Sequence, residues 1–230
     1  MAVARGASIG QAARQAATDF YFNSLRFVPA NVAWSLAALV VLFAGSVWPP
    51  AIVLVVLLAI PLAGIHRLAA LLARGEPASL GDFVDGMRRS WLHATGVGVG
   101  LAIVAAVLVT NLVTGFTSGN PLGWFVGATA LWGLVALVMF AVAIWPALVD
   151  PRHEGASLRR RVQLAGLVVI GRPGRLFALT ALVVAILAVS TVVLGAIVLA
   201  AVSYACILAT RWVLPAIDEL EARYEAARTR

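Results

Sequence analysis

Three long stretches of the chain contain no Arg, Lys, Asp, Glu or His. These uncharged stretches are residues 27–65, 94–149 and 176–210. A helix that crosses a bilayer needs about 20 apolar residues, because each residue adds about 1.5 Å against roughly 30 Å of hydrocarbon. Each stretch is therefore too long for one crossing and long enough for two. The pattern predicts an all-α, polytopic transmembrane helical bundle, with six spans arranged as three hairpins.

Residues that favour turns lie within the uncharged stretches and mark the expected tips of the hairpins. Residues 48–50, Trp-Pro-Pro, divide the first stretch, and residues 117–121, Thr-Ser-Gly-Asn-Pro, divide the second. The third stretch offers a turn either near Ser190 or near Gly195, and the sequence does not decide between them. In the fourth span, Trp124 and Trp145 are about 31 Å apart at helical rise. Because Trp is favoured at membrane interfaces, this spacing predicts one indole at each interface.

Arginine sets the expected orientation of the chain. All 17 basic residues are Arg, and none lies at a hairpin tip. Short loops rich in Lys or Arg stay in the cytoplasm, so both termini are predicted to be cytoplasmic. A five-span alternative, in which residues 176–210 cross once, would export the Arg-rich tail. Six spans are therefore favoured.

The composition leaves no room for a soluble domain, since 62% of the residues are hydrophobic and 12% are charged. Residues 1–230 are therefore predicted to form a single integral membrane domain. The net charge of +7 would suggest nucleic acid for a soluble protein. Here the cytoplasmic placement of the arginines explains the positive charge. We therefore expect the positive segments to contact membrane lipids and not nucleic acid. Cys206 is the only cysteine, which excludes an intrachain disulfide.

Four polar segments flank the spans and are predicted to be cytoplasmic. They are an N-terminal segment, two elbows and a C-terminal helix, at residues 1–26, 74–93, 150–175 and 211–230. The first has apolar residues at helical spacing, which suits a helix in the membrane interface. Its many alanines also suit a frayed tail. The last continues the apolar face of the sixth span and carries mixed charges on its other face.

The two elbows share a short motif. Glu76-Pro-Ala-Ser-Leu80 recurs as Glu154-Gly-Ala-Ser-Leu158, which weakly favours an internal repeat of a hairpin and an elbow. In the first elbow, Ser79 and Asp82 are typical of a helix N-terminal cap, and an apolar stripe follows. Both elbows are predicted to be short amphipathic helices at the cytoplasmic ends of the bundle.

Several short motifs occur in a recognisable order along the chain. They are Asn31-Val-Ala-Trp34, Pro61 before His66-Arg67, Arg74-Gly-Glu76, Asp82-Phe83 leading to Trp91, and Trp145-Pro-Ala-Leu148 followed by Ser157-Leu158-Arg159. Their order resembles the YesL-like family of bacterial membrane proteins, which is described as having no known function. The chain departs from the family at Val32 and Ala33, where Leu-Leu is usual, and residues 159–161 are more basic. The resemblance implies a bacterial inner-membrane protein associated with carbohydrate uptake systems.

No pattern typical of an enzyme occurs in the chain. The acids are confined to the polar segments, the three His are far apart, and no zinc-protease, phosphate-loop or nucleophile-elbow motif is present. We therefore expect no enzymatic activity, no metal and no cofactor. Gly96 and Gly100 fit a close helix contact better than a nucleotide-binding loop, because no strand precedes them.

A few uncharged polar side chains fall within the spans. The candidate intramembrane cluster consists of Asn31, Trp34, Asn111 and Thr114. Asn111 either lines a polar cavity or makes an interhelical hydrogen bond, because a buried amide in lipid seeks a partner. No Asp, Glu, His or Arg falls at mid-membrane depth, which disfavours an ion-coupled transporter.

The candidate docking residues lie at the cytoplasmic ends of the spans and in the elbows. They are His66, Arg67, Asp82, Phe83, Arg88, Arg89, Trp91, Arg159, Arg160 and Arg161. The pair His66-Arg67 suits an anionic group at the inner mouth, or an Arg that reaches the headgroups. Residues 159–161 suit anionic lipid or an acidic partner, or they only hold the loop inside.

Two functions follow as hypotheses. The first, drawn from the family resemblance, is a non-catalytic accessory or regulatory partner of a carbohydrate uptake system, with transporter subunits as partners. The second is a small facilitator or channel-like transporter, with a path lined by Asn31, Asn111 and Ser and Thr side chains. A homo-oligomer is compatible with either function.

Overall fold

The computed structural model describes residues 8–193 and 197–228. Within these residues the chain is helical and contains no strand. Six helices are long and apolar enough to cross a membrane: Ser24–Val47, Pro49–Ala73, Leu80–Thr117, Pro121–Val149, Pro173–Val192 and Leu199–Ala227. This confirms the prediction of an all-α, polytopic bundle, and the protein is membrane-embedded.

The first hairpin follows a short N-terminal helix. The elements are α1 (Ile9–Phe22), α2 (Ser24–Val47), the 3₁₀ helix η1 (Pro49–Leu58) and α3 (Ala59–Ala73). The tip lies at Trp48, as predicted, because Pro49 and Pro50 have no N–H group with which to continue α2.

The second and third hairpins complete the bundle. The elements are α4 (Leu80–Thr117), α5 (Pro121–Val149), the short 3₁₀ helix η2 (Pro151–His153), α6 (Leu158–Gly171), α7 (Pro173–Val192), the π-helical turn η3 (Ile197–Ala201) and α9 (Val202–Arg228). The second tip falls within residues 117–121, as predicted. In the third hairpin α7 continues past Ser190, and Gly195 lies outside the described residues.

Only one of the two predicted elbows is a separate helix. Most of residues 74–93 belong to α4, which runs without a break into the third span. The prediction of a separate first elbow is therefore wrong, because no proline interrupts the helix and isolated glycines cost only about 1 kcal/mol each. The second elbow is α6, which ends at Gly171. Arg172 then has a non-helical backbone (φ −141°, ψ 50°), and Pro173 begins α7.

Helix α1 packs along α9. Ala12 and Ala16 are fully buried. The hydroxyl of Tyr204 donates to the carbonyl of Ala13 at 3.2 Å, and Arg211 pairs with Asp19 at 2.6 Å. The N-terminal segment therefore contains the helix expected from its spacing, and a neighbouring helix covers one of its faces.

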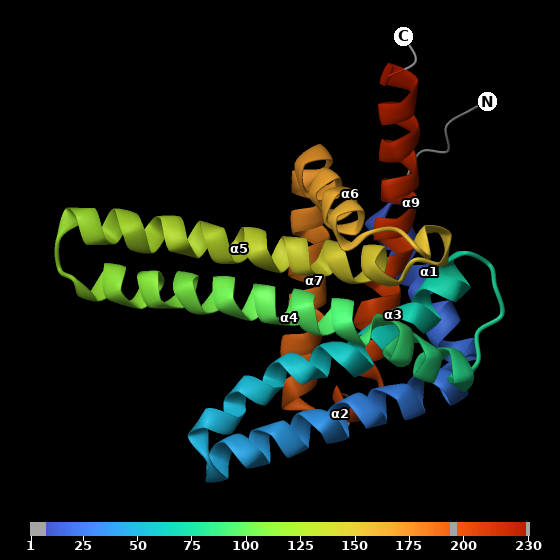
Figure 1. Ribbon diagram of the computed structural model, residues 1–230, viewed down its shortest axis with the longest axis horizontal. Coiled ribbons are helices and arrows are strands. Elements are labelled where there is room, and N and C mark those ends of the chain that lie inside the picture. The colour runs from blue at the N-terminus through green and yellow to red at the C-terminus, as the bar shows by residue number, and fades with distance from the viewer. Residues whose placement is uncertain (1–7, 194–196, 229–230) are drawn as a thin grey trace.

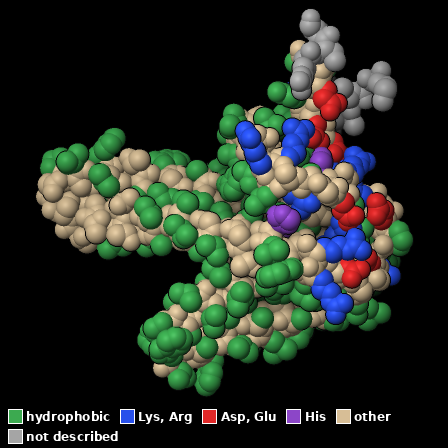
Figure 2. Space-filling model, in the orientation of Figure 1, with side chains coloured by type: hydrophobic (Ala, Val, Ile, Leu, Met, Phe, Trp, Pro, Cys, Tyr) green, Lys and Arg blue, Asp and Glu red, His purple; other side chains and the backbone are tan. Residues whose placement is uncertain are grey.

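The three hairpins leave a common region and diverge from it (Figure 1). In this view the α4–α5 hairpin extends to the left as a long arm, and α7 and α9 run across its base. Figure 2 shows that Arg, Asp, Glu and His side chains gather where the helices converge, while the arms present apolar side chains. We call this region, formed by residues 66–93, 150–175 and 211–228, the charged end.

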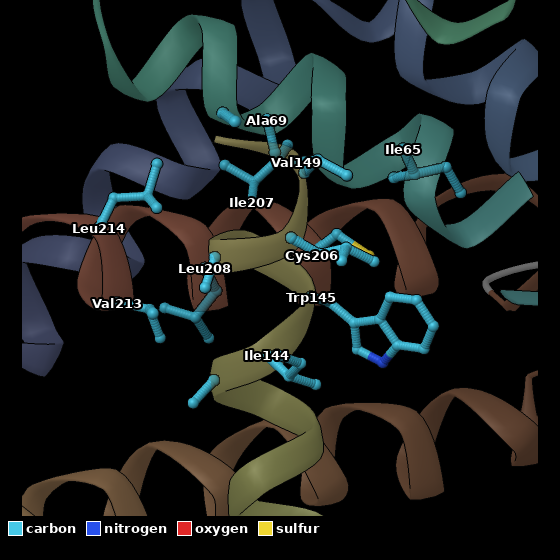
Figure 3. Packing of buried hydrophobic residues seen from close by; sticks show 14 of the residues in the cluster. Ile65, Ala69, Ile144, Trp145, Val149, Cys206, Ile207, Leu208, Val213 and Leu214 are labelled. Atoms are coloured by element: carbon cyan, nitrogen blue, oxygen red, sulfur yellow. The ribbon is translucent and has the colours of Figure 1, made fainter. Parts of the chain in front are cut away.

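The core lies next to the charged end, where α3, α5 and α9 meet (Figure 3). Its large, fully buried side chains include Ile65, Leu68, Ile144, Leu148, Ile207, Leu208 and Leu214. Helices in lipid associate mainly through such close packing, because lipid tails are as apolar as the side chains. Trp145 belongs to this core and is 8% exposed. Neighbouring helices cover this indole at the end of α5, and its position at a membrane interface stays a prediction.

Candidate functional site

A buried ion-pair network joins three helices at the charged end. Arg74 follows α3, Asp150 follows α5, and Asp218 lies in α9. The Arg74 guanidinium donates to Asp150 through Nε at 3.0 Å and Nη2 at 2.5 Å, and to Asp218 through Nη1 at 2.5 Å. The side chains of Arg74 and Asp150 are 6% and 0% exposed. Because paired Arg–carboxylate hydrogen bonds are short and directional, this network fixes the ends of α3 and α5 relative to α9.

The carboxyl group of Asp150 is held in its charged form. Burial by itself raises the pKa of an aspartate, but the hydrogen bonds and charge of Arg74 outweigh this effect. With further donors from Arg152 and His153, they hold the pKa of Asp150 below its ordinary value. The His153 ring extends the network, because Nδ1 lies 3.1 Å from Asp150 and Nε2 lies 3.2 Å from Glu221.

Two arginines bind carbonyl groups at the C-terminal end of α5. Arg67 donates to the carbonyl of Val149 at 3.1 Å, and Arg161 donates to the carbonyl of Leu148. The last carbonyls of a helix have no partner within the helix, and the helix dipole favours a cation there. Arg161 also donates to the carbonyl of His153 at 3.1 Å. These contacts explain why one Arg of the basic run is buried.

A pocket of about 470 Å³ lies beside these arginines. The end of α3, the first turns of α4 and the segment from α5 to α6 form its walls. Its ionisable and hydroxyl lining residues are Arg67, Arg89, Ser90, His93, Asp150, Glu154, Ser157 and Arg161. We call this cavity the basic pocket.

The basic pocket carries an excess of positive charge. Among its lining acids, Asp150 is already paired with Arg74 outside the pocket. Glu154 pairs with Arg67 and lies 3.9 Å from Arg89. The N-terminus of α6 also borders the pocket, and a helix N-terminus attracts anions. The arrangement is therefore suited to an anionic ligand.

The pocket brings together three of the predicted docking residues, Arg67, Arg89 and Arg161, from distant parts of the sequence. His66 lies elsewhere, buried in α3, with Nδ1 at 3.2 Å from the hydroxyl of Thr210. Its contact is with α9, so of the predicted His66-Arg67 pair only the arginine lines the pocket.

The remaining predicted docking residues divide into two groups. The buried or bonded ones are Asp82, which accepts from the backbone N–H of Ser79 at 2.8 Å, Phe83 in the core, and Arg160, which pairs with Glu221 at 2.7 Å. The exposed ones are Arg88, Trp91 and Arg159. The predicted docking set therefore contains both residues with structural contacts and residues exposed at the surface.

Asn31 makes a buried contact between α2 and the start of α9. Its Oδ1 accepts from the backbone N–H of Ser203 at 2.8 Å, where the π-helical turn gives way to α9. The hydroxyl of Ser203 donates to the carbonyl of Phe27 at 3.1 Å. Trp34 lies one turn further along α2, beside an apolar groove.

The other two members of the predicted intramembrane cluster lie on the α4–α5 arm. Asn111 is exposed in a shallow groove beside Phe125 and Thr129, and the hydroxyl of Thr114 donates to the carbonyl of Thr110 at 2.7 Å. The four polar residues are thus split between two regions. None of the pockets described in this part of the chain is lined by both Asn31 and Asn111.

Sequence reasoning missed Arg74, Asp150 and Asp218 as members of a site. A signal was present, because Arg74 and Asp150 each follow directly after the end of a span, at the depth where the charged residues meet. Their mutual pairing is invisible in the sequence. Across the described residues, no group of three or more His, Cys, Asp and Glu side chains is placed to hold a metal ion.

Comparison with family models, curated proteins and solved structures finds no match to this chain. The resemblance to the YesL-like family stays a prediction from short motifs.

Proposed function

We propose that this protein is a non-catalytic component of the bacterial inner membrane, with both termini in the cytoplasm, and an accessory or regulatory partner of a carbohydrate uptake system. The observation that carries the proposal is the buried network of Arg74, Asp150 and Asp218. The network holds the charged end in one arrangement, and a preformed surface loses less conformational entropy when a partner binds.

Exposed side chains at the charged end suit a protein partner. Arg88, Trp91 and Arg159 are exposed at the charged end, and Arg and Trp are enriched at protein interfaces. Carbohydrate uptake as the partner system rests on the YesL-like resemblance. A facilitator with a polar path has less support, since Asn31 is used between two helices and Asn111 lies on the outside of an arm.

Co-purification from native membranes in a mild detergent tests the proposal. We expect transporter subunits to accompany the chain, and sugar uptake to fall when its gene is removed. The double variant Arg88→Glu with Arg159→Glu should lose the partner, whereas Arg88→Lys with Arg159→Lys, which keeps both charges, should retain it. Recovery of the chain without transporter subunits, together with unchanged sugar uptake in the deletion strain, would falsify the proposal.

Fusion reporters at the two chain ends test the orientation separately. A fluorescent protein, which matures in the cytoplasm, should fluoresce at both ends. Alkaline phosphatase, which needs the periplasm, should stay inactive at both. Phosphatase activity at either end would contradict the proposed orientation.

A further inference from the structure

The basic pocket places three guanidinium groups from three separate helices around one cavity. Arg67 comes from α3, Arg89 from α4 and Arg161 from α6. The hydroxyl-bearing Ser90 and Ser157 line the same cavity, and Ser157 caps α6 at its N-terminus. Side-chain cations, hydroxyl groups and a helix N-terminus are the groups that proteins use to bind phosphate.

Arg161 supplies a second, independent indication of a ligand. Its side chain is buried, with 9% of the residue exposed. Two of its nitrogens bind the carbonyls of Leu148 and His153, but its Nε–H has no hydrogen-bond partner among the described residues. A buried donor without an acceptor is costly, and Arg161 carries this unpaired donor at the wall of the basic pocket.

Glu154 indicates where the ligand would bind. Its carboxylate contacts Arg67 and lies 3.9 Å from Arg89, although the side chain is 48% exposed on the segment before α6. Gly155, the next residue, also lines the pocket and has a positive φ of 87°, a conformation that favours glycine. An acidic side chain from a short exposed segment thus occupies two of the three arginines that line the cavity.

We propose that the basic pocket binds a phosphate monoester group, and that Glu154 occupies the same arginines when no phosphate is bound. A carboxylate has two oxygens in one plane, whereas a phosphate presents three terminal oxygens to donors from different directions. The volume of about 470 Å³ lies within the range of small-molecule sites. The phosphate belongs either to a soluble molecule or to the headgroup of a lipid. This proposal does not depend on the carbohydrate uptake role.

The test uses the full chain in phosphatidylcholine nanodiscs. One arm titrates inorganic phosphate by calorimetry. The other adds phosphatidic acid to the nanodiscs and detects retained lipid by native mass spectrometry. Arg89 is the residue to change, because Arg161 also holds the end of α5. Arg89→Gln should weaken binding about tenfold, the loss expected for a charged hydrogen bond, and Glu154→Gln should strengthen it several-fold.

Arg175→Gln is the matched control, because Arg175 is an exposed arginine of the charged end that does not line the basic pocket. It should bind like the unaltered chain. Saturable phosphate binding in plain nanodiscs would identify a soluble ligand, and retention of phosphatidic acid alone would identify a lipid headgroup. Either result supports the proposal. Absence of both, or equal losses in the Arg175 and Arg89 variants, would overturn it.

Discussion

Residues 74–93 and 150–175, which connect the hairpins, begin with nearly the same motif and are held in the fold by different forces. In both, a serine starts a helix, Ser79 before α4 and Ser157 before α6. Helix α4 then continues into the membrane, whereas α6 ends at Gly171 and the chain changes direction. The shared motif determines where each helix begins, and the residues that follow determine where it ends.

The first segment is held by close approach of two helices. A β-carbon on Gly64 of α3 would lie 2.7 Å from the ring of Phe83. A β-carbon on Gly86 of α4 would lie 2.7 Å from Cβ of Arg67. Small residues permit this approach, as they do at many helix contacts in membranes.

The second segment is held by charge pairs with residues far along the chain. Asp150 binds Arg74, the first residue of the first segment, and Arg160 binds Glu221 in α9. A glycine allows two helices to come close together, whereas an ion pair selects a particular partner. Only the ion pair depends on protonation, so the two segments should respond differently to mutation and to pH.

The largest effect is expected for Asp150→Ala. The substitution leaves the buried guanidinium of Arg74 with Asp218 alone, and breaking a buried pair costs about 3–5 kcal/mol. Denaturant unfolding in detergent micelles, followed by circular dichroism, measures the loss. The exposed pair between Arg89 and Asp85 is the control, because Asp85→Ala should change stability by less than about 1 kcal/mol. Equal losses for the two variants would contradict the central position of the network.

Acid should weaken the ion pairs of the second segment and leave the glycine contact of the first segment unchanged. The pKa of Asp150 is lowered in the folded protein, so its contribution is complete above the ordinary pKa of 3.8 and is lost as the pH falls through the lower folded pKa. A pH series of melting temperatures should show this loss, and Asp150→Asn should flatten the acid limb. An acid limb that is unchanged in Asp150→Asn would count against this assignment.

A smaller effect is expected where the first segment packs. Gly86→Ala should cost about 1–3 kcal/mol, because the added carbon meets Cβ of Arg67 and the backbone of Gly64. A β-carbon on Gly96 of the same helix would have no neighbouring atom within 4 Å. Gly96→Ala should therefore stabilise the chain by up to about 1 kcal/mol. Melting temperatures of the two variants provide the measurement, and shifts in the same direction would refute the close contact.

The smallest effect is expected at the helix starts, where the two segments are alike. Ser157→Ala removes the acceptor for the backbone N–H of Arg160, and Asp82→Ala removes the acceptor for the backbone N–H of Ser79. Each loss should cost about 1 kcal/mol. Unfolding free energies that differ by several kcal/mol would show that one of these caps has a further role.

Much of the fold could be predicted from local features of the chain. The tips at Trp48 and near Pro121 follow from residues that cannot continue a helix, and the start of α4 follows from its capping residues. The continuity of α4 was missed because a cap marks only a beginning. The partner of Asn31 was missed because Ser203 lies at the other end of the chain.

By itself, the sequence determined that this protein is a membrane-embedded bundle of helical hairpins, since lipid excludes ionised side chains and the uncharged stretches have the length of paired crossings. Only the tertiary structure decided which charges meet. Arg74, Asp150 and Asp218 pair, and Arg67, Arg89 and Arg161 share a pocket, because helices distant in sequence converge at one end. Hydropathy is a local property of each segment, whereas the choice among many possible ion pairs depends on how the helices pack.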